Sequence, residues 1–156
     1  MAVTIKKERI VNNWSSLVEN GGGKTTQLYQ AMEAGLARAN LPDVQWRHDQ
    51  VNSGLFTKGR DFLIISNSGL SDYRMFLSIR DYGQHLDCSW YLTCQPGIMK
   101  RMAAQRALSV FSEQDLSAWV GAVHRTFLNE IRELMRELDQ DVTGLNTQGK
   151  GYLAVW

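Results

Sequence analysis

The sequence predicts one α+β domain, a two-layer sandwich in which an antiparallel sheet of four or five strands carries helices on one face. Two patterns indicate this fold. Residues 73–82 and 85–94 alternate apolar and polar side chains with a period of two, which is the side-chain period of a strand. Residues 116–138 place apolar side chains at helical spacing. The 156 residues show no repeat or change of composition that marks a second domain.

The first forty residues are predicted to form a helical hairpin. Apolar side chains recur at helical spacing within residues 5–18, at Ile10, Trp14, Leu17 and Val18. Residues 21–23 are glycines, which permit the left-handed turn that ends many helices. Thr25 or Thr26 is then expected to cap a second helix that runs to about Asn40, because a proline follows shortly and cannot continue it.

Residues 43–95 are predicted to build the sheet. Residues 44–51 form its most polar strand, which suits an edge position. Residues 61–66 have a continuous apolar centre, which indicates a central strand or one buried on both faces. The two alternating strands that follow form a hairpin around Gly83. We expect the helices to cover its apolar face, which consists of Tyr73, Met75, Leu77, Ile79, Leu86, Cys88, Trp90, Leu92 and Cys94.

The C-terminal third is predicted to contain one long packing helix. Ser112 followed by Asp115 resembles a capping box, so this helix is expected over residues 112–139. His124 lies just off its apolar stripe and is expected to be partly buried and hydrogen-bonded. Residues 98–110 favour helix by composition but space their apolar side chains irregularly, which leaves one helix and two short pieces both open.

Composition restricts the classes of function. The formal net charge of +1 gives no general attraction to nucleic acid or to an anionic membrane. Cys88 and Cys94 lie six residues apart on one face of a strand, so at ~3.3 Å per residue they are about 20 Å apart and cannot form a disulfide. They are interpreted as free thiols of a cytoplasmic protein, and we expect no metal site, no cofactor and no membrane segment.

The segment NGGGKTT, around Lys24, is similar in composition to a phosphate-binding loop. Its spacing does not fit, because Val18 stands where that motif requires its first glycine. We interpret the segment as a glycine linker before a helix. A weak anion site at Lys24 and the helix amides is the lesser alternative.

The leading functional hypothesis is a non-catalytic module that binds a protein partner or a second copy of itself. It would use the Leu55 and Phe56 loop, the apolar C-terminal strand at residues 151–156, which ends in Trp156, and the polar face of the hairpin. That face is predicted to present Arg74, Phe76, Arg80, Tyr82 and Tyr91. A merely solvated face, stabilised by its cross-strand pairs, is the simpler interpretation.

Two other classes remain as alternatives. Arg74, Arg80, Tyr82 and Tyr91 are residue types with which a single-stranded nucleic acid or nucleotide is bound. Catalysis on a phosphoester would need His85, Asp87 and His48 to converge in one pocket. The sequence favours a protein that is not an enzyme, because a histidine near a carboxylate is weak support without a pocket.

Overall fold

The computed structural model describes residues 3–56, 58–97 and 109–151. The strands are β1 (Val3–Thr4), β2 (Ile10–Val18), β3 (Val44–Asn52), β4 (Arg60–Asn67), β5 (Tyr73–Tyr82), β6 (His85–Cys94) and β7 (Lys150–Gly151). The helices are α1 (Thr25–Ala39) and α3 (Val110–Glu137), with short 3-10 turns at Lys7–Arg9, Ser68–Leu70 and Val142–Gly144.

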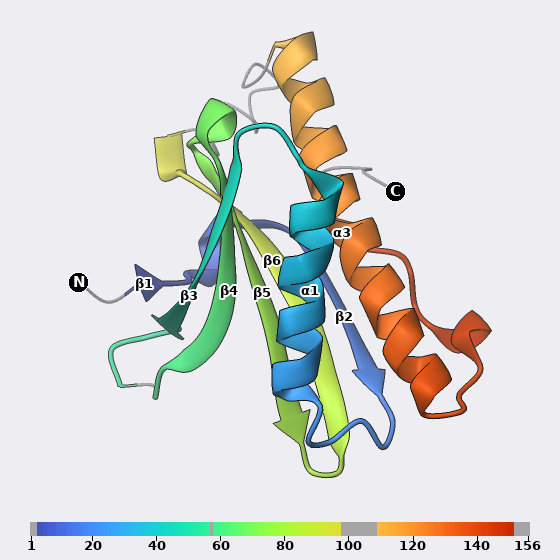
Figure 1. Ribbon diagram of the computed structural model, residues 1–156. Helices are drawn as coiled ribbons and strands as arrows, with labels where there is room; N and C mark the ends of the chain where they lie inside the picture. The colour runs from blue at the N-terminus through green and yellow to red at the C-terminus, as the bar shows by residue number, and fades with distance from the viewer. Residues whose placement is uncertain (1–2, 57, 98–108, 152–156) are drawn as a thin grey trace.

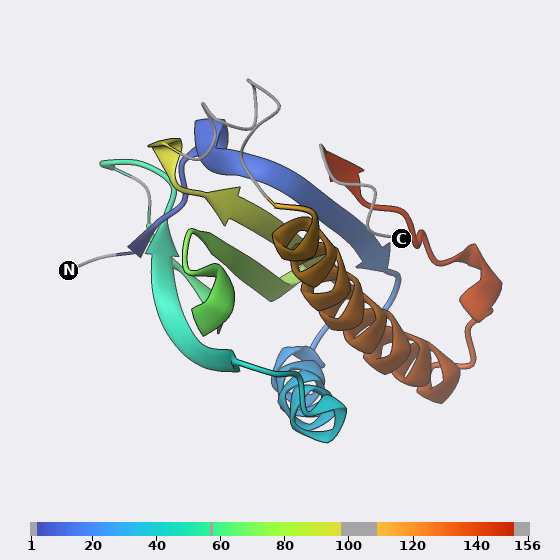
Figure 2. The ribbon, with the colours of Figure 1, turned by 90° about the horizontal axis from the view of Figure 1, so that it is seen from above.

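All seven strands belong to one sheet, in the order β1-β3-β4-β5-β6-β2-β7, and both helices lie against the same face of it (Figures 1 and 2). The predicted α+β fold with helices on one face is therefore confirmed. The predicted number of strands and the purely antiparallel pairing are wrong. β1 runs parallel to β3, and β1 and β2 extend the sheet beyond the strands that the sequence indicated. β7 begins at the place where the C-terminal strand was predicted.

The predicted N-terminal helical hairpin is wrong, because its first half is strand β2. The spacing of Trp14 and Val18 suits a helix, but a separation of four residues also keeps both on one face of a strand. Tertiary pairing decides between them: Trp14 lies opposite Trp90 of β6, and its indole N–H donates to the Asn146 carbonyl at 2.9 Å. The β2 segment also contains paired asparagines and serines, which are poor helix formers.

Both helices begin differently from the predictions. In α3 the capping side chain is Ser109, whose Oγ accepts a hydrogen bond from the Ser112 N–H at 3.1 Å, so the helix starts before the predicted box. In α1 neither threonine caps. Instead the Asp81 carboxylate at the end of β5 accepts from the Gly23 N–H at 2.9 Å and from the Thr25 hydroxyl at 3.3 Å.

The helix-facing core agrees with the prediction. Tyr73, Met75, Leu77 and Ile79 of β5 and the apolar side chains of β6 pack with both helices in one buried cluster. That cluster also includes the predicted stripe of α3, namely Leu116, Trp119, Val120, Val123, Phe127, Ile131 and Leu134. No helix in the described part of the chain is long and apolar enough to cross a membrane.

The sheet edges also agree with the sequence in part. β4 is central and buried on both faces, as predicted. In the described part of the chain, the outer edge of β3 pairs with β1 at Val51 and Asn52 alone. At the other edge, β7 adds to β2 with Gly151 opposite Asn12. A side chain at Gly151 would meet the Val11 carbonyl within 2.2 Å, so this close pairing requires glycine. The rest of the predicted C-terminal strand, including Trp156, lies outside the described residues, as do residues 98–108.

Candidate functional site

The face of the sheet away from α1 and α3, here called the open face, carries most of the side chains that the sequence singled out. The β5–β6 hairpin pairs in the predicted register, with Arg74 opposite Thr93 and Phe76 opposite Tyr91. Tyr82 lies opposite His85 at the Gly83 turn. Residues opposite each other in an antiparallel pair share a face, so the predicted set of side chains does lie together.

The middle of the open face is not a solvated surface, which corrects one prediction. Phe76 is only 3 % exposed, and it packs with Val51, Phe62 and Ile64 in a second, smaller apolar cluster. The Phe76 and Phe62 rings meet edge-on with centroids 6.3 Å apart. Phe76 therefore stabilises the fold and does not present its ring to a partner, and Tyr91 is half-buried against the same cluster.

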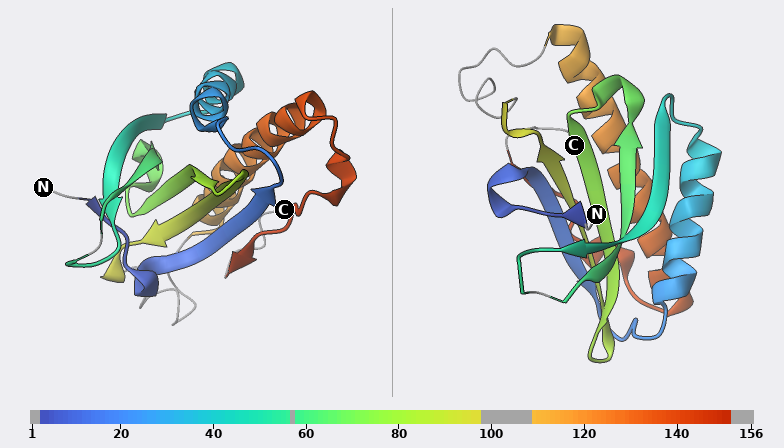
Figure 3. Two further views of the ribbon diagram at one scale, coloured as in Figure 1. Left: turned by 90° about the horizontal axis from the view of Figure 1, so that it is seen from below. Right: turned by 90° about the vertical axis from the view of Figure 1, so that its left-hand side faces the viewer.

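The cover over this second cluster is the N-terminal segment of residues 3–9, here called the strap. Its first residues pair with the end of β3, and the Ile5 N–H donates to the Asn52 carbonyl at 2.9 Å. It then continues through the Lys7–Arg9 turn into β2 at the other side of the sheet, so it crosses the open face (Figure 3). Val3 and Ile5 pack on the apolar cluster from above.

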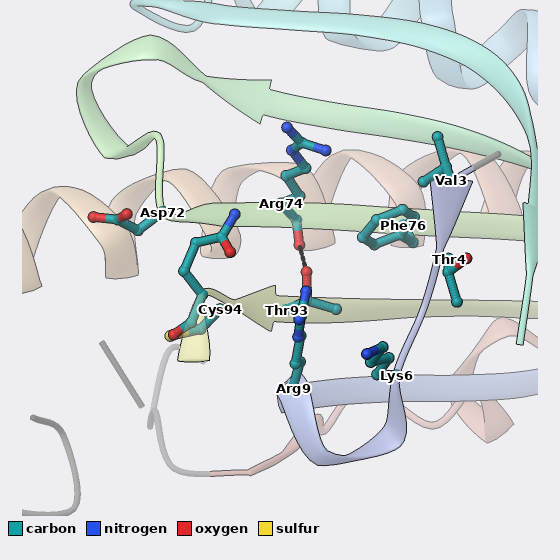
Figure 4. A pocket seen from close by; sticks show the side chains of 10 residues that line it. Val3, Thr4, Lys6, Arg9, Asp72, Arg74, Phe76, Thr93 and Cys94 are labelled. Carbon is teal, nitrogen blue, oxygen red and sulfur yellow. Dashed lines mark hydrogen bonds between the residues drawn. The ribbon is translucent and has the colours of Figure 1, made fainter. Parts of the chain in front are cut away.

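One pocket, here called the strap pocket, lies between the strap and β5–β6 (Figure 4). Its volume is about 380 Å³. The basic residues that line it are Lys6 and Arg9 of the strap and Arg74 of β5, and the acidic one is Asp72. Val3 and Phe76 are the large apolar residues in its lining. In the described parts of the chain, none of the three cations makes an ion pair within 4.0 Å.

A second pocket, here called the loop pocket, lies beside the β3–β4 connection and has a volume of about 710 Å³. Its apolar lining comes from Ile5, Ile10, Val51, Phe62 and Tyr91. Its charged lining is entirely basic, from Lys7, Lys58 and Arg60. An apolar lining with cations around it suits a ligand that is both apolar and acidic.

The β3–β4 connection next to the loop pocket presents two large apolar side chains to water. Leu55 is 97 % exposed and Phe56 is 100 % exposed. The two predicted loop anchors are therefore fully accessible. Adjacent exposed apolar side chains are characteristic of an interaction site, because leaving them in water is unfavourable.

Arg80 and Tyr82 form a small cluster at the end of β5. The Arg80 Nε donates to the Asp87 carboxylate at 2.9 Å, and its guanidinium lies 5.3 Å from the centre of the Tyr82 ring. Arg80 is thus already engaged by a carboxylate and an aromatic face. Tyr82 is 60 % exposed and remains accessible.

His48 lies on the helix side of the sheet edge. It pairs across the sheet with Leu63, which belongs to the helix-facing core, and its Nε2 lies 3.4 Å from the Glu33 carboxylate of α1. Its ring also meets Tyr29 of α1 edge-on at 5.0 Å. These contacts attach the edge strand to the helix.

His85 and Asp87 lie on the opposite face from His48, so the structure does not bring the three catalytic candidates together. The His85 Nδ1 accepts a hydrogen bond from the Asn20 N–H at 3.1 Å, and Asp87 is paired with Arg80. Within the described residues, no group of three or more His, Cys, Asp or Glu side chains is arranged to hold a metal ion.

His124 is buried and hydrogen-bonded, more completely than predicted. Its Nδ1 accepts from the Trp90 indole N–H at 3.0 Å, and its Nε2 lies 2.7 Å from the Thr147 carbonyl. Burial is the main cause that lowers the pKa of His124. Cys88 and Cys94 are free buried thiols, as expected.

The glycine segment before α1 holds no open anion site at its amide. The Gly23 N–H, with φ at +83°, donates to the chain's own Asp81 carboxylate. That carboxylate occupies the position that an anion would take at the helix start, so the linker interpretation of NGGGKTT is supported.

Sequence reasoning missed Lys6, Lys7 and Arg9, which it assigned to the start of a helix. Only the alternation of Val3 and Ile5 with polar neighbours indicates an extended segment there. Comparison with protein-family models, curated proteins and solved structures finds no match to the chain. Its function is therefore inferred from the open face.

Proposed function

We propose that the protein is a non-catalytic interaction module that binds a protein partner through the Leu55–Phe56 tip and the loop pocket beside it. The observation that carries the proposal is the full exposure of these two neighbouring side chains. Burying a leucine or phenylalanine side chain in an interface contributes roughly 1.5–3 kcal/mol. Two such anchors at a loop tip are a typical core of a small interface.

Charge supports a partner with acidic side chains around its apolar contact. The two pockets of the open face together hold six of the 17 lysines and arginines but only one of the 16 acidic residues. The rest of the chain is left with 11 basic against 15 acidic residues. The net charge of +1 is therefore unevenly distributed, and the linings of the two pockets are positive. A positive surface attracts acidic partners and raises their association rate.

The same charges favour a different protein over a second copy of this chain. Two copies that met through their loop pockets would place Lys7, Lys58 and Arg60 of each against those of the other. Like charges in an interface are unfavourable. The one described residue of the predicted C-terminal strand, Gly151, pairs with β2 of the same chain and adds no support for self-association.

Nucleic acid and catalysis receive less support. Arg80 is already paired with Asp87, and Tyr91 is half-buried against the second cluster, so the proposed base-stacking surface is reduced to Arg74 and Tyr82. For phosphoester hydrolysis, the histidine candidates lie on opposite faces of the sheet.

Site-specific photo-crosslinking tests the proposal. A photoreactive residue at Ser53 is compared in the wild-type chain, in Leu55→Ser/Phe56→Ser, and in Val110→Ser/Phe111→Ser. The last variant is a matched control, because Val110 and Phe111 are also exposed neighbours but start α3. We expect the wild-type chain and the control variant to crosslink to one defined protein. The yield of this crosslink should fall at 500 mM salt, and the loop variant should not form it. A crosslink that survives the loop substitutions, or no defined product with wild type, contradicts the proposal.

A further inference from the structure

We propose that the strap pocket is a binding site for a small organic phosphate monoester, held as its dianion. This ligand and this pocket are separate from the protein partner at the loop tip. The pocket is about 380 Å³, within the range of roughly 300–1,000 Å³ that small-molecule sites occupy.

Three cations surround the pocket from two independent parts of the fold. Lys6 and Arg9 line it from the strap, and Arg74 lines it from β5, with its guanidinium on the β4 side of that strand (Figure 4). Asp72 is the acidic residue in the lining, and it lies toward the end of the pocket away from Lys6. Three positive charges against one negative charge leave a formal +2, which matches a dianion.

No ion pair within the described residues engages the three cations of the strap pocket. Five ion pairs form among the described residues, and none of them includes Lys6, Arg9 or Arg74. Arg9 is half-buried as a residue, and it makes no ion pair with a described carboxylate. Arg80 on the same face, by contrast, has its own carboxylate in Asp87.

The residue types favour a phosphate over a carboxylate. A guanidinium offers two parallel N–H donors that match phosphate oxygens, and a lysine adds a point charge. Two arginines and a lysine supply more donors than a single carboxylate accepts. Val3 and Phe76 add apolar residues to the lining of the pocket, which suits an organic group attached to the phosphate.

Two consequences follow from this geometry. A phosphate monoester loses its second charge below a pKa of about 6, so binding should weaken between pH 7 and pH 5. Because two of the cations belong to the strap, a bound ligand also ties the strap to β5. Exchange of the Ile5 amide hydrogen, which bonds the Asn52 carbonyl, should therefore slow.

Isothermal titration with phenyl phosphate tests the site, with phenyl methyl phosphate and succinate as comparison ligands. We expect Arg9→Gln and Arg74→Gln each to weaken phenyl phosphate binding about tenfold, since each removes one charge-assisted contact. Asp72→Asn should tighten binding. Arg60→Gln is the matched control, because it removes the same charge from the same face but outside the strap pocket.

Several outcomes would overturn the proposal. The first is the absence of binding at 10 mM phenyl phosphate. The second is that Arg60→Gln weakens phenyl phosphate binding as much as Arg9→Gln or Arg74→Gln does. The third is that succinate or the singly charged diester binds as tightly as phenyl phosphate. Unchanged exchange of the Ile5 amide at saturation would do so as well. Circular dichroism of each variant establishes that the fold is retained, which is expected because Arg74 is exposed and Arg9 makes no contact with a carboxylate.

Discussion

Replacing His124 with phenylalanine should lower the stability of the fold and remove part of its pH dependence. His124 is 1 % exposed and bridges β6 to the segment after α3. The Trp90 indole N–H can only donate and the Thr147 carbonyl can only accept. The imidazole is therefore neutral, with its hydrogen on Nε2, which donates to Thr147.

The magnitude follows from what phenylalanine keeps and what it loses. A phenyl ring retains most of the volume and the edge contacts that His124 makes with Trp14, at 5.3 Å, and with Trp90, at 5.6 Å. Both hydrogen bonds are lost, and each contributes a net of about 0.5–1.5 kcal/mol. The free energy of unfolding should fall by about 1–3 kcal/mol at pH 7.5.

The sign of the pH effect follows from the direction of the pKa shift. Burial lowers the pKa of His124 in the folded state below the ordinary 6.5. The unfolded chain thus binds a proton more readily, and the contribution of His124 is present above pH 6.5 and is lost as the pH falls toward the folded pKa. Urea unfolding at pH 7.5 and 5.5, followed by tryptophan fluorescence, measures both effects.

The control for this experiment is His48→Asn, which removes a histidine at the sheet edge that makes neither of the two His124 hydrogen bonds. If His124→Phe costs less than about 0.5 kcal/mol, the two hydrogen bonds do not support the fold as argued. If wild type and His124→Phe lose stability in parallel between the two pH values, the buried neutral imidazole is not the source of the slope.

Three further substitutions or treatments test the fold. Phe76→Ala should lower the free energy of unfolding in urea by about 3–5 kcal/mol, whereas Tyr82→Ala should lower it by under about 1 kcal/mol. Similar losses in the two variants would contradict the burial of Phe76. Asp81→Ala should cost about 1 kcal/mol, seen as a lower Tm, because α1 loses its cap; an unchanged Tm would refute that role. Burial raises the pKa of the Cys88 and Cys94 thiols, that of Cys94 to about 11. Iodoacetamide at pH 8 should therefore label neither thiol until the chain is denatured, because the thiolate is the reactive form. Rapid labelling of the native chain would contradict the burial of these thiols.

The sheet hairpin was predictable because the alternation of apolar and polar residues within each strand indicates which side chains face the core. From Tyr73 to Cys94 the apolar side chains fall on every second residue, and a shift of one residue would expose all of them. The α3 stripe was predictable for the same reason, since from Leu116 to Leu134 it maintains one helical face. In both elements the local pattern and the tertiary burial agree.

Strand β2 was not predictable from its own residues. Trp14 and Val18 satisfy the helix and the strand periods equally, and Val11 is brought to the helix side by an irregularity in the pairing with β6. Its partners, β6 and residues 146–151, lie at least 68 residues away from the positions that they pair with or bond. Only the complete sheet, with a vacant edge beside β6, selects the extended conformation.

The strap was also missed because its partners lie far away in the chain. The sequence therefore did not predict either pocket of the open face. Lys6 and Arg9 belong to a charged run that is ordinary at a helix start, and nothing local indicates that it crosses a sheet. Yet both pockets have the strap as one wall and the sheet as the other. Arg74 is fixed by two neighbouring strands, while the described part of the strap is attached to β3 by the short β1 pairing and by the hydrogen bond from the Ile5 N–H to the Asn52 carbonyl. Any ligand that spans these walls must therefore stabilise the strap relative to the sheet, so strap protection reports binding even where the ligand itself is unknown.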